Sequence, residues 1–162
     1  MAQAAENILR RACELVGLAP NGIELVRLGD HAVFRVNGGR VVSRVGRHAD
    51  RLPSVRREVA VAQWLEAVSY PAVRLVAQVE QPVVVEGRPV TFWEGLADGE
   101  QYAGTHEMGA LLRRLHSLEA PHFSLPELRP FDKIKKRLER AFLHERGQPG
   151  IPLCHRTPRK RT

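Results

Sequence analysis

Residues 40–58, with the sequence RVVSRVGRHADRLPSVRRE, decide the fold, because they predict a β-strand followed by an α-helix. The strand covers residues 41–45, where three valines favour extended structure. The helix covers residues 55–68, and Pro53 and Ser54 open it in the way that proline and serine often begin helices. The remaining predicted elements are arranged around this strand and helix.

Arg44 places a cation in the middle of the apolar strand. Side chains alternate along a strand, so Arg44 shares a face with Val42, whereas its immediate neighbours in sequence point the other way. Burying a cation is costly unless an anion meets it, and Glu58 in the second helical turn is a candidate partner. Such a pair beside a cleft can prepare a phosphate site. A strand-edge arginine and a solvated glutamate would give the same sequence, so these two residues alone leave both interpretations open.

The composition is that of one soluble domain or slightly more, with 162 residues, 43% hydrophobic residues and a mean hydropathy of -0.28. No apolar run approaches the length of a membrane span, and the N-terminus lacks the basic and apolar regions of an export signal. Cys13 and Cys154 have no metal-ligand spacing and make no disulfide framework. We therefore expect a cytoplasmic protein without a membrane partner.

The net charge of +7 comes mainly from the C-terminal end. Residues 146–162 contain five basic residues and no acidic residue, which leaves 20 basic and 18 acidic residues in residues 1–145. A basic tail gives nonspecific, salt-dependent affinity for nucleic acid. No aromatic stacking platform or recognition helix accompanies this tail, so nucleic-acid binding is the least favoured function.

Hydrophobic periodicity predicts a helix at residues 6–16 and strands at residues 23–28 and 32–36. The sequence Asn37-Gly38-Gly39 then predicts a hairpin into the strand that carries Arg44, which makes three consecutive antiparallel strands. Further strands are expected at residues 73–79, 82–85 and 90–93. The fold class is therefore α+β, with a five-stranded antiparallel sheet and one packed helix.

The character of the sequence changes after Trp93, where a polar connector containing glycines begins. Thr105 is the expected N-cap of an amphipathic helix. Its apolar stripe consists of Met108, Leu111, Leu112, Leu115 and Leu118. A basic amphipathic helix is expected next, with Phe131, Ile134, Leu138 and Phe142 as its apolar positions. Residues 147–162 have no periodicity and are rich in Pro, Gly and Arg, so we expect them to be disordered.

Six short motifs follow one another in a characteristic order along residues 5–145. They are the turn at Gly29, RVVSRVGR (40–47), RREVAVAQWL (56–65), PVTFWEGLADGE (89–100), MGALLRRLHSL (108–118) and PFDKIKKRLE (130–139). Together they resemble the N-terminal half of an aminoglycoside phosphotransferase family protein, one of the small-molecule kinases with a protein-kinase-like fold. The resemblance implies four segments: a nucleotide-binding N-lobe at 1–93, a hinge or linker at 94–104, the first helices of an incomplete C-lobe at 105–145 and a basic tail at 146–162.

The resemblance also implies roles for individual residues. Arg44 corresponds to the cation that binds the nucleotide phosphates, Glu58 to the helix residue that holds this cation, and Val42 lies on the same face. The turn that would cover the phosphates consists of Gly29, Asp30 and His31. The hinge that would bind the adenine edge, through backbone groups of Trp93 and Gly95, consists of Phe92, Trp93, Glu94 and Gly95.

The cofactor implied by the resemblance is ATP. Phosphoryl transfer also needs a carboxylate that orients the acceptor hydroxyl, and an Asn and an Asp that hold Mg²⁺. In this family those groups lie in an HGDxxxxN loop and on a later strand, but no HGD occurs in the chain. We therefore expect no catalytic residue and no metal ligand here, and interpret the chain as a truncated or frameshifted phosphotransferase that retains its nucleotide lobe.

A second interpretation is a non-catalytic nucleotide-binding half-kinase or regulatory protein, completed by another chain. The acceptor in the full-length family is a small-molecule hydroxyl, and the sequence does not specify which one. The apolar stripes of the two last helices would pack against the remainder of a C-lobe. Without that remainder, their exposure would allow self-association.

Overall fold

The computed structural model describes residues 2–96, residues 103–127 and seven residues between 129 and 138. The chain divides into two compact units, Met1–Pro121 and His122–Thr162. The described part of the second unit contains short helical segments, and Ile134 and Leu138 are each 51% exposed there. The expected basic tail at residues 146–162 lies outside the described residues, as does the middle of the predicted linker. No helix among the described residues is long and apolar enough to cross a membrane.

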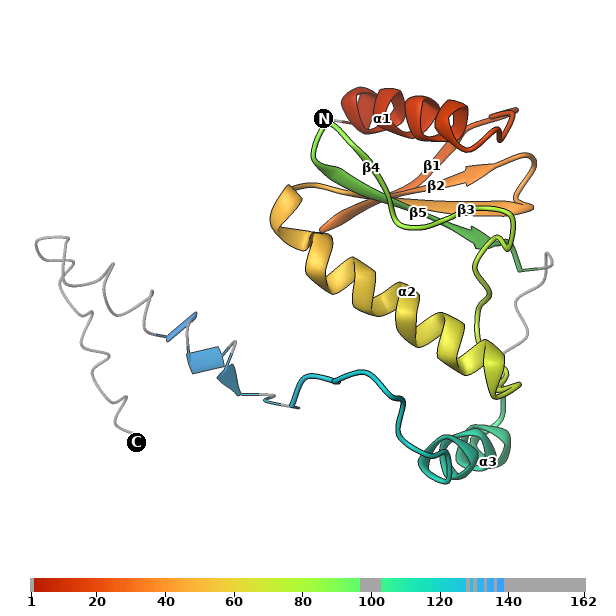
Figure 1. Cartoon of the computed structure of the whole chain (residues 1–162), viewed down its shortest axis with the longest axis vertical. Coiled ribbons are helices and arrows are strands. Elements are labelled where there is room, and N and C mark those ends of the chain that lie inside the picture. The colour runs from red at the N-terminus through yellow and green to blue at the C-terminus, as the bar shows by residue number, and fades with distance from the viewer. Residues whose placement is uncertain are drawn as a thin grey trace, which may run out of the picture. The chain divides into compact units, whose positions relative to one another are not determined.

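The first unit is built on a five-stranded antiparallel sheet with the strand order β1-β2-β3-β5-β4 (Figure 1). The strands are β1 (Glu24–Leu28), β2 (His31–Val36), β3 (Val41–Gly46), β4 (Val83–Val85) and β5 (Arg88–Glu94). Every neighbouring pair is antiparallel. This arrangement confirms the predicted α+β class and the predicted five-stranded sheet.

The β2–β3 hairpin forms where the sequence predicted it. Asn37, Gly38 and Gly39 all have positive φ, at 56°, 65° and 87°. Glycine and asparagine tolerate this left-handed region better than other residues, so the turn sequence favours one hairpin geometry. The resulting register pairs His31 with Gly46, which places the beginning of β2 beside the end of β3.

The predicted strand at residues 73–79 does not form. Within the described residues this segment contributes one isolated bridge, between Leu75 and Trp93. The N–H of Val76 still donates to the Phe92 carbonyl (3.1 Å), but the side chain of Gln81 takes the rest of the ladder position. Its amide oxygen accepts from the N–H of Phe92 (2.7 Å), and its amide nitrogen donates to the Phe92 carbonyl (3.0 Å). A side-chain amide can replace a strand in this way, and the alternation of residue types cannot reveal it.

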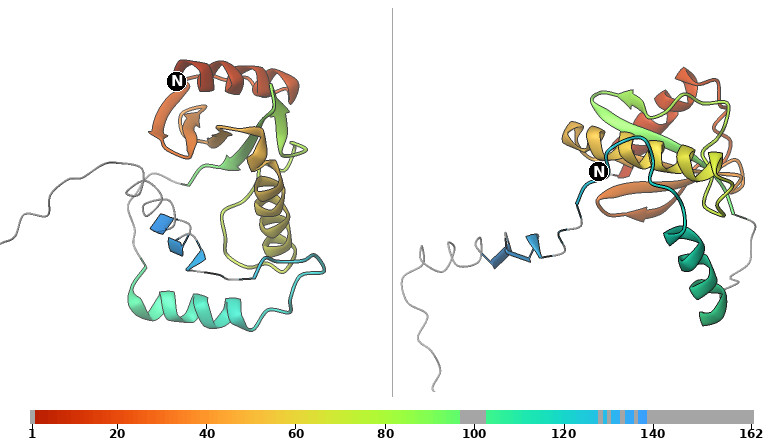
Figure 2. Two further views of the ribbon diagram at one scale, coloured as in Figure 1. Left: turned by 90° about the vertical axis from the view of Figure 1, so that its left-hand side faces the viewer. Right: turned by 60° about the horizontal axis from the view of Figure 1, so that its bottom comes forward.

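Helices cover both faces of the sheet (Figures 1 and 2). Helix α1 (Ala2–Leu15) lies along one face. Helix α2 (Leu52–Ala67) lies along the other and is preceded by a 3-10 turn, η1 (Ala49–Arg51). Both helices begin a few residues before the predicted boundaries, because the first turn of a helix needs no apolar periodicity of its own.

The main core lies between α1 and the sheet. Its large, almost fully buried side chains are Leu9, Phe34, Val36, Val45, Val90 and Phe92. Two polar groups also lie on this face of the sheet or helix. Ser43 is fully buried, and its hydroxyl donates to the Thr91 carbonyl (3.1 Å), which offsets the cost of burial. Burial raises the pKa of the Cys13 thiol to about 11, so this thiol stays protonated in the core.

Helix α3 (Thr105–His116) begins differently from the prediction. Thr105 is the first helical residue, and Gly104 is the N-cap. The N–H of Gly104 donates to the Glu107 carboxylate (2.8 Å), so the glutamate at the third helical position closes the helix end. No residue of α3 is buried, and its apolar stripe includes Met108 at 49% exposure.

Contacts with the end of α2 hold α3 in place. The hydroxyl of Tyr70 donates to the Leu111 carbonyl (3.2 Å), and the guanidinium of Arg114 donates to the Ser69 carbonyl (2.6 Å). The same guanidinium lies over the Tyr70 ring, 5.7 Å from its centroid. These contacts are polar and few, so α3 is attached to the unit without contributing to its core.

Gly95, directly after β5, packs against the β2–β3 hairpin so closely that a Cβ there would overlap the backbone carbonyl of Gly39. We therefore expect Gly95→Ala to lower the free energy of unfolding by at least about 2 kcal/mol, measured by urea denaturation. Gly109→Ala is the matched control, because the nearest atom to its new Cβ is an Arg113 nitrogen at 3.8 Å. Helix propensity predicts that this control keeps or raises stability, by up to about 1 kcal/mol. Equal stability of the two variants would contradict the close approach.

Candidate functional site

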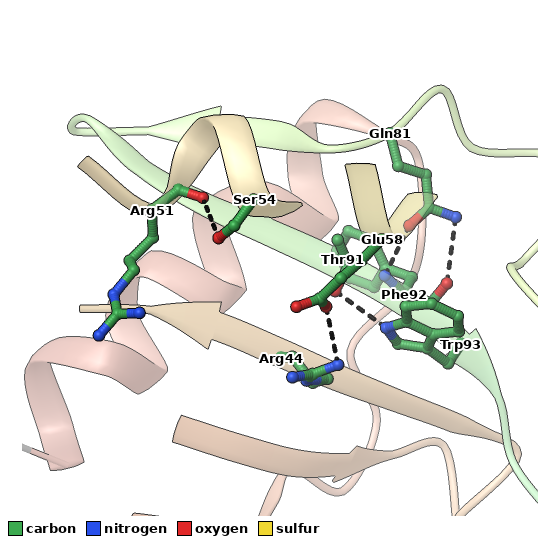
Figure 3. A network of polar contacts seen from close by, with 8 residues as sticks. All are labelled: Arg44, Arg51, Ser54, Glu58, Gln81, Thr91, Phe92 and Trp93. Atoms are coloured by element: carbon green, nitrogen blue, oxygen red, sulfur yellow. Dashed lines mark hydrogen bonds and ion pairs between the residues drawn. The ribbon is translucent and has the colours of Figure 1, made fainter. Parts of the chain in front are cut away.

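An ion pair between β3 and α2 forms the centre of the site. The Nη1 atom of Arg44 donates to Oε2 of Glu58 at 3.0 Å (Figure 3). Arg44 lies opposite Val33 on β2 and Thr91 on β5, on the sheet face that α2 covers. The two side chains are 35% and 41% exposed. The contact confirms that this arginine and glutamate are partners, and it removes the alternative of two independent solvated charges.

The energetics of this pair favour a positioning role over a stabilising one. Ion pairs with this much exposure contribute about 1 kcal/mol or less, because water and salt screen them. The contact nevertheless fixes the guanidinium of Arg44 on an otherwise open face. A guanidinium has five donors, so Arg44 can bind Glu58 and still offer N–H groups to an anion.

Val42 and Trp93 form an apolar area beside the ion pair. Trp93 is 8% exposed and packs with Val59, Ala62 and Leu75, and Val42 lies against this cluster. The indole N–H of Trp93 donates to the Thr91 hydroxyl (2.9 Å). Val42 is half-buried and borders the open part of the face, as expected of a side chain that could lie under a ring.

The side chains of the first two predicted hinge residues are structural. Phe92 is fully buried on the α1 face, and the Trp93 ring belongs to the smaller core under α2. Any contact that these two residues make with a ligand must therefore come from their backbone groups.

Backbone pairing shows which hinge groups are already occupied. Trp93 pairs with Val42, and the N–H of Gly95 donates to the Arg40 carbonyl (2.8 Å), which continues the β3–β5 ladder by one residue. The N–H of Glu94 points the other way, to the Arg74 carbonyl (2.9 Å). Because backbone groups alternate along a strand, the Glu94 carbonyl also faces away from β3, and the next residue on that side is Leu96.

The turn between β1 and β2 lies at the same end of the sheet face as Arg44. The N–H of Gly29 donates to the His31 carbonyl (3.0 Å), so the turn is closed by its own backbone. His31 pairs with Gly46, and alternation puts its ring on the face of Arg44. Asp30, between them, is exposed. The structure thus brings the predicted turn residues beside the ion pair.

The surroundings of His31 lower its pKa. Burial lowers this pKa below its ordinary value of 6.5, and the positive charges of Arg44 and Arg51 lower it further. The carboxylates of Glu58 and Asp30 act in the opposite direction and are outweighed. His31 is therefore held in its neutral form by the fold.

The sequence motifs do not predict Arg51 as a site residue. It lies seven residues before Glu58, which is two helical turns, and residues with this spacing share a helix face. That spacing is the signal that could have identified it. The seven-residue spacing indicates a site residue only once Glu58 is known to face the sheet. On the opposite face of the helix, the same spacing would point Arg51 into solvent.

The ion pair lies on a partly exposed face of the sheet, apart from the two cavities described next. Among the described residues, a cavity of about 630 Å³ lies between the end of α1, α2 and residues 78–83, and another of about 130 Å³ lies between α1 and the end of β3. Neither is lined by Arg44 or Glu58. An open face suits a ligand that is enclosed by further structure on its other side.

The described residues do not form a metal site, because they contain no group of three His, Cys, Asp or Glu side chains that could hold an ion. The two carboxylates near Arg44 are Glu58, which is paired, and Asp30, which is exposed. These residues do not fit Mg²⁺ by themselves.

Three features together define the class of protein: an antiparallel five-stranded sheet, a helix packed on one face, and a strand cation held by a helix glutamate. This is the N-lobe of the kinase-like phosphotransferases, in which such an ion pair positions the nucleotide phosphates. The chain belongs to the phosphotransferase enzyme family, whose model matches residues 23–158, more than half of the chain. The aminoglycoside phosphotransferase family indicated by the motifs is thereby confirmed.

The limits of the family match differ from those of the motif resemblance. The match begins at residue 23, just before β1, so α1 lies outside it. It ends at residue 158, so most of the basic segment after residue 145 is part of the family match. No curated protein and no solved structure shows a significant match to the chain.

We expect Arg44→Gln to raise the pKa of His31, because the largest positive influence on the ring is lost while Glu58 remains. NMR titration of the histidine ring measures this directly. Arg10→Gln on α1 is the control and should leave the pKa of His31 unchanged.

The same lowered pKa has a consequence for stability. The folded state binds fewer protons than the unfolded state just below pH 6.5. The stability that neutral His31 contributes is therefore present above this pH and is lost as the pH falls through the folded pKa.

The Arg44→Gln titration can also contradict the geometry. If this substitution leaves the pKa of His31 unchanged, the two side chains are not close to each other.

Proposed function

We propose that this chain is the nucleotide-binding part of an ATP-dependent phosphotransferase that acts on a small-molecule hydroxyl. The observation that carries the proposal is the 3.0 Å contact between Arg44 and Glu58 on an open sheet face, in a chain of the phosphotransferase enzyme family. ATP would supply the phosphoryl group. A cytoplasmic location, expected from the sequence, suits a protein that uses ATP.

The arrangement suits a nucleotide because its parts lie along one direction. Val42 is near the hinge end of β3, and Arg44 follows two residues later on the same face. A base over Val42 would therefore direct its phosphates toward Arg44 and the turn of Gly29, Asp30 and His31. Glu58 holds the Arg44 guanidinium before the ligand arrives, so little reorganisation is needed on binding.

The β3–β5 ladder limits which backbone groups of the hinge could contact a base. The N–H of Gly95 is committed to the Arg40 carbonyl, so contacts through Trp93 and Gly95, as the family resemblance implied, would compete with the sheet. We infer that the Glu94 carbonyl and the Leu96 N–H meet the base edge instead. They face away from β3, so that a nucleotide can bind them without breaking a backbone hydrogen bond of the β3–β5 ladder.

Binding and transfer are separable in this chain. No HGD sequence occurs among the 162 residues, and the described residues do not form a metal site. We propose that the chain as written binds nucleotide without transferring its phosphate, as a truncated or frameshifted phosphotransferase would.

A half-kinase completed by another chain is the second candidate function. The exposed apolar side chains of α3, among them Met108 at 49% and Leu112 at 47%, favour it because they offer a surface for a C-lobe partner or a second copy. Activity that appears only when a complementary chain is added would distinguish this candidate.

Arg44→Ala should weaken ATP binding at least about tenfold, because a charge-assisted hydrogen bond to phosphate is lost. The free energy of unfolding should change by less than about 1 kcal/mol, since the ion pair is half-exposed. Isothermal titration with ATP and urea denaturation measure the two effects. Arg10→Ala is the matched control, because it breaks another partly exposed ion pair, with Glu6 on α1.

The two parts of this prediction fail separately. If the wild-type chain does not bind ATP, the proposed function is wrong. If the wild-type chain binds ATP and Arg44→Ala binds it equally well, the function stands and the role of Arg44 is wrong.

The purified 162-residue chain should not convert ATP to ADP, with or without Mg²⁺ and a panel of hydroxylated acceptors. The reason is that the 162-residue sequence contains no HGD, the motif whose carboxylate orients the acceptor in this family. A coupled ADP assay, calibrated with a known kinase, measures this. Sustained turnover above the protein-free background would refute non-catalytic binding.

A further inference from the structure

Arg51 occupies a fixed position at the junction of η1 and α2. Its N–H donates to the His48 carbonyl (3.3 Å), and its own carbonyl accepts from the Ser54 hydroxyl (2.9 Å). The backbone that carries this side chain is thus held from both directions, although the residue itself is exposed. A side chain that starts from a fixed backbone loses less entropy when it binds a ligand.

The side chain of Arg51 lies on the same side of α2 as the ion pair. Arg51 and Glu58 are two helical turns apart and share a helix face. Figure 3 shows the Arg51 side chain extending from the start of the helix toward the sheet, as Glu58 does further along. Both cations, Arg44 from β3 and Arg51 from the helix start, therefore border the same open face.

His31 lies on the same face as this pair of cations. The register places its ring on the face of Arg44, at the end of β3 nearest to η1. The positive charges of Arg44 and Arg51 both act on this ring, against Glu58 and Asp30. Three elements, β2, β3 and η1, thus bring His31, Arg44 and Arg51 to the same face of the sheet.

The charges at this point are incompletely balanced. Arg44 is paired with Glu58, whereas Arg51 takes part in none of the ion pairs found among the described residues. A nucleotide polyphosphate carries several negative charges, and a single guanidinium already shared with a carboxylate neutralises only part of them. A further cation is what a polyphosphate needs beside Arg44.

The direction of the strand decides which phosphate Arg51 would meet. The hinge joins the sheet where Val41 pairs with Glu94, and β3 runs from there toward Gly46 and η1. A base at the hinge end places its first phosphates at Arg44, and the later phosphates continue toward Arg51. With the base at the hinge, the later phosphates of a triphosphate would approach Arg51, whereas the single phosphate of a monophosphate would end near Arg44.

We propose that Arg51 is a second phosphate-binding cation of this site, which contacts the phosphates furthest from the base and makes the site selective for nucleoside triphosphates over monophosphates. The inference rests on the proposed nucleotide-binding function. Arg51 would act with Arg44 as a two-armed clamp, one arm from the sheet and one from the helix start.

The test compares Arg51→Ala with the wild-type chain by isothermal titration with ATP, ADP and AMP at one fixed salt concentration. We expect about tenfold weaker ATP binding, a smaller loss for ADP and unchanged AMP binding. Arg57→Ala is the matched control: it removes the same charge from an exposed position of α2 outside the Arg51–Glu58 face, and should change ATP affinity less than about twofold. Arg51→Lys should retain most of the ATP-to-AMP affinity ratio, because a cation remains.

The outcomes separate this inference from the function on which it rests. If the wild-type chain fails to bind ATP, the function and the inference fall together. If Arg44→Ala weakens ATP binding but Arg51→Ala does not, only the role of Arg51 is wrong. An equal loss of ATP and AMP affinity would show a structural effect and would also overturn the inference. The ATP-to-AMP affinity ratio remains informative if Arg51→Ala melts at a lower temperature, because partial unfolding weakens the binding of both ligands equally.

Discussion

The contact between Arg44 and Glu58 is the constraint on which the candidate site depends, although it contributes little to stability. It joins two elements whose placement is decided elsewhere: the hairpin sets the register of β3, and the burial of Val55 and Val59 sets the rotation of α2. A small error in either would separate the charges by more than a hydrogen bond. The pair therefore forms only when sheet and helix are correctly assembled, and it then holds the Arg44 guanidinium in one position.

The sheet divides stability and binding between its two faces. On the α1 face, Phe34 and Phe92 are almost fully buried, and large side chains of this kind contribute roughly 2 kcal/mol each on burial. On the α2 face, the helix covers Trp93 and leaves Arg44 and His31 partly open. Because strand side chains alternate, one strand serves both purposes: Ser43 closes the core while Arg44 faces the site.

The hinge shows how backbone pairing limits what a binding site can use. Gln81 binds both backbone groups of Phe92, and the Arg40 carbonyl takes the N–H of Gly95. The close approach of Gly95 to the hairpin explains the need for glycine at this position without any ligand. In the proposed function, contacts to the base would therefore fall to the hinge groups that the ladder leaves facing outward, and selectivity among phosphates would fall to Arg44 and Arg51.

The sequence by itself determined the features that local patterns encode. These are the three hairpin-linked strands, the helix after Pro53 and the family, because turn chemistry, periodicity and motif order are all written in short stretches. The sequence offered Glu58 as a candidate partner of Arg44, and the structure showed the contact. Only the tertiary structure decided three others: that residues 73–79 form no strand, that Gly104 caps α3, and that the Arg51 side chain extends toward the sheet face that carries Arg44. Each of these depends on a partner, namely the Gln81 amide, the Glu107 carboxylate and the sheet face beneath α2. Competition between a local preference and such a partner is settled by three-dimensional packing, which a residue pattern does not contain.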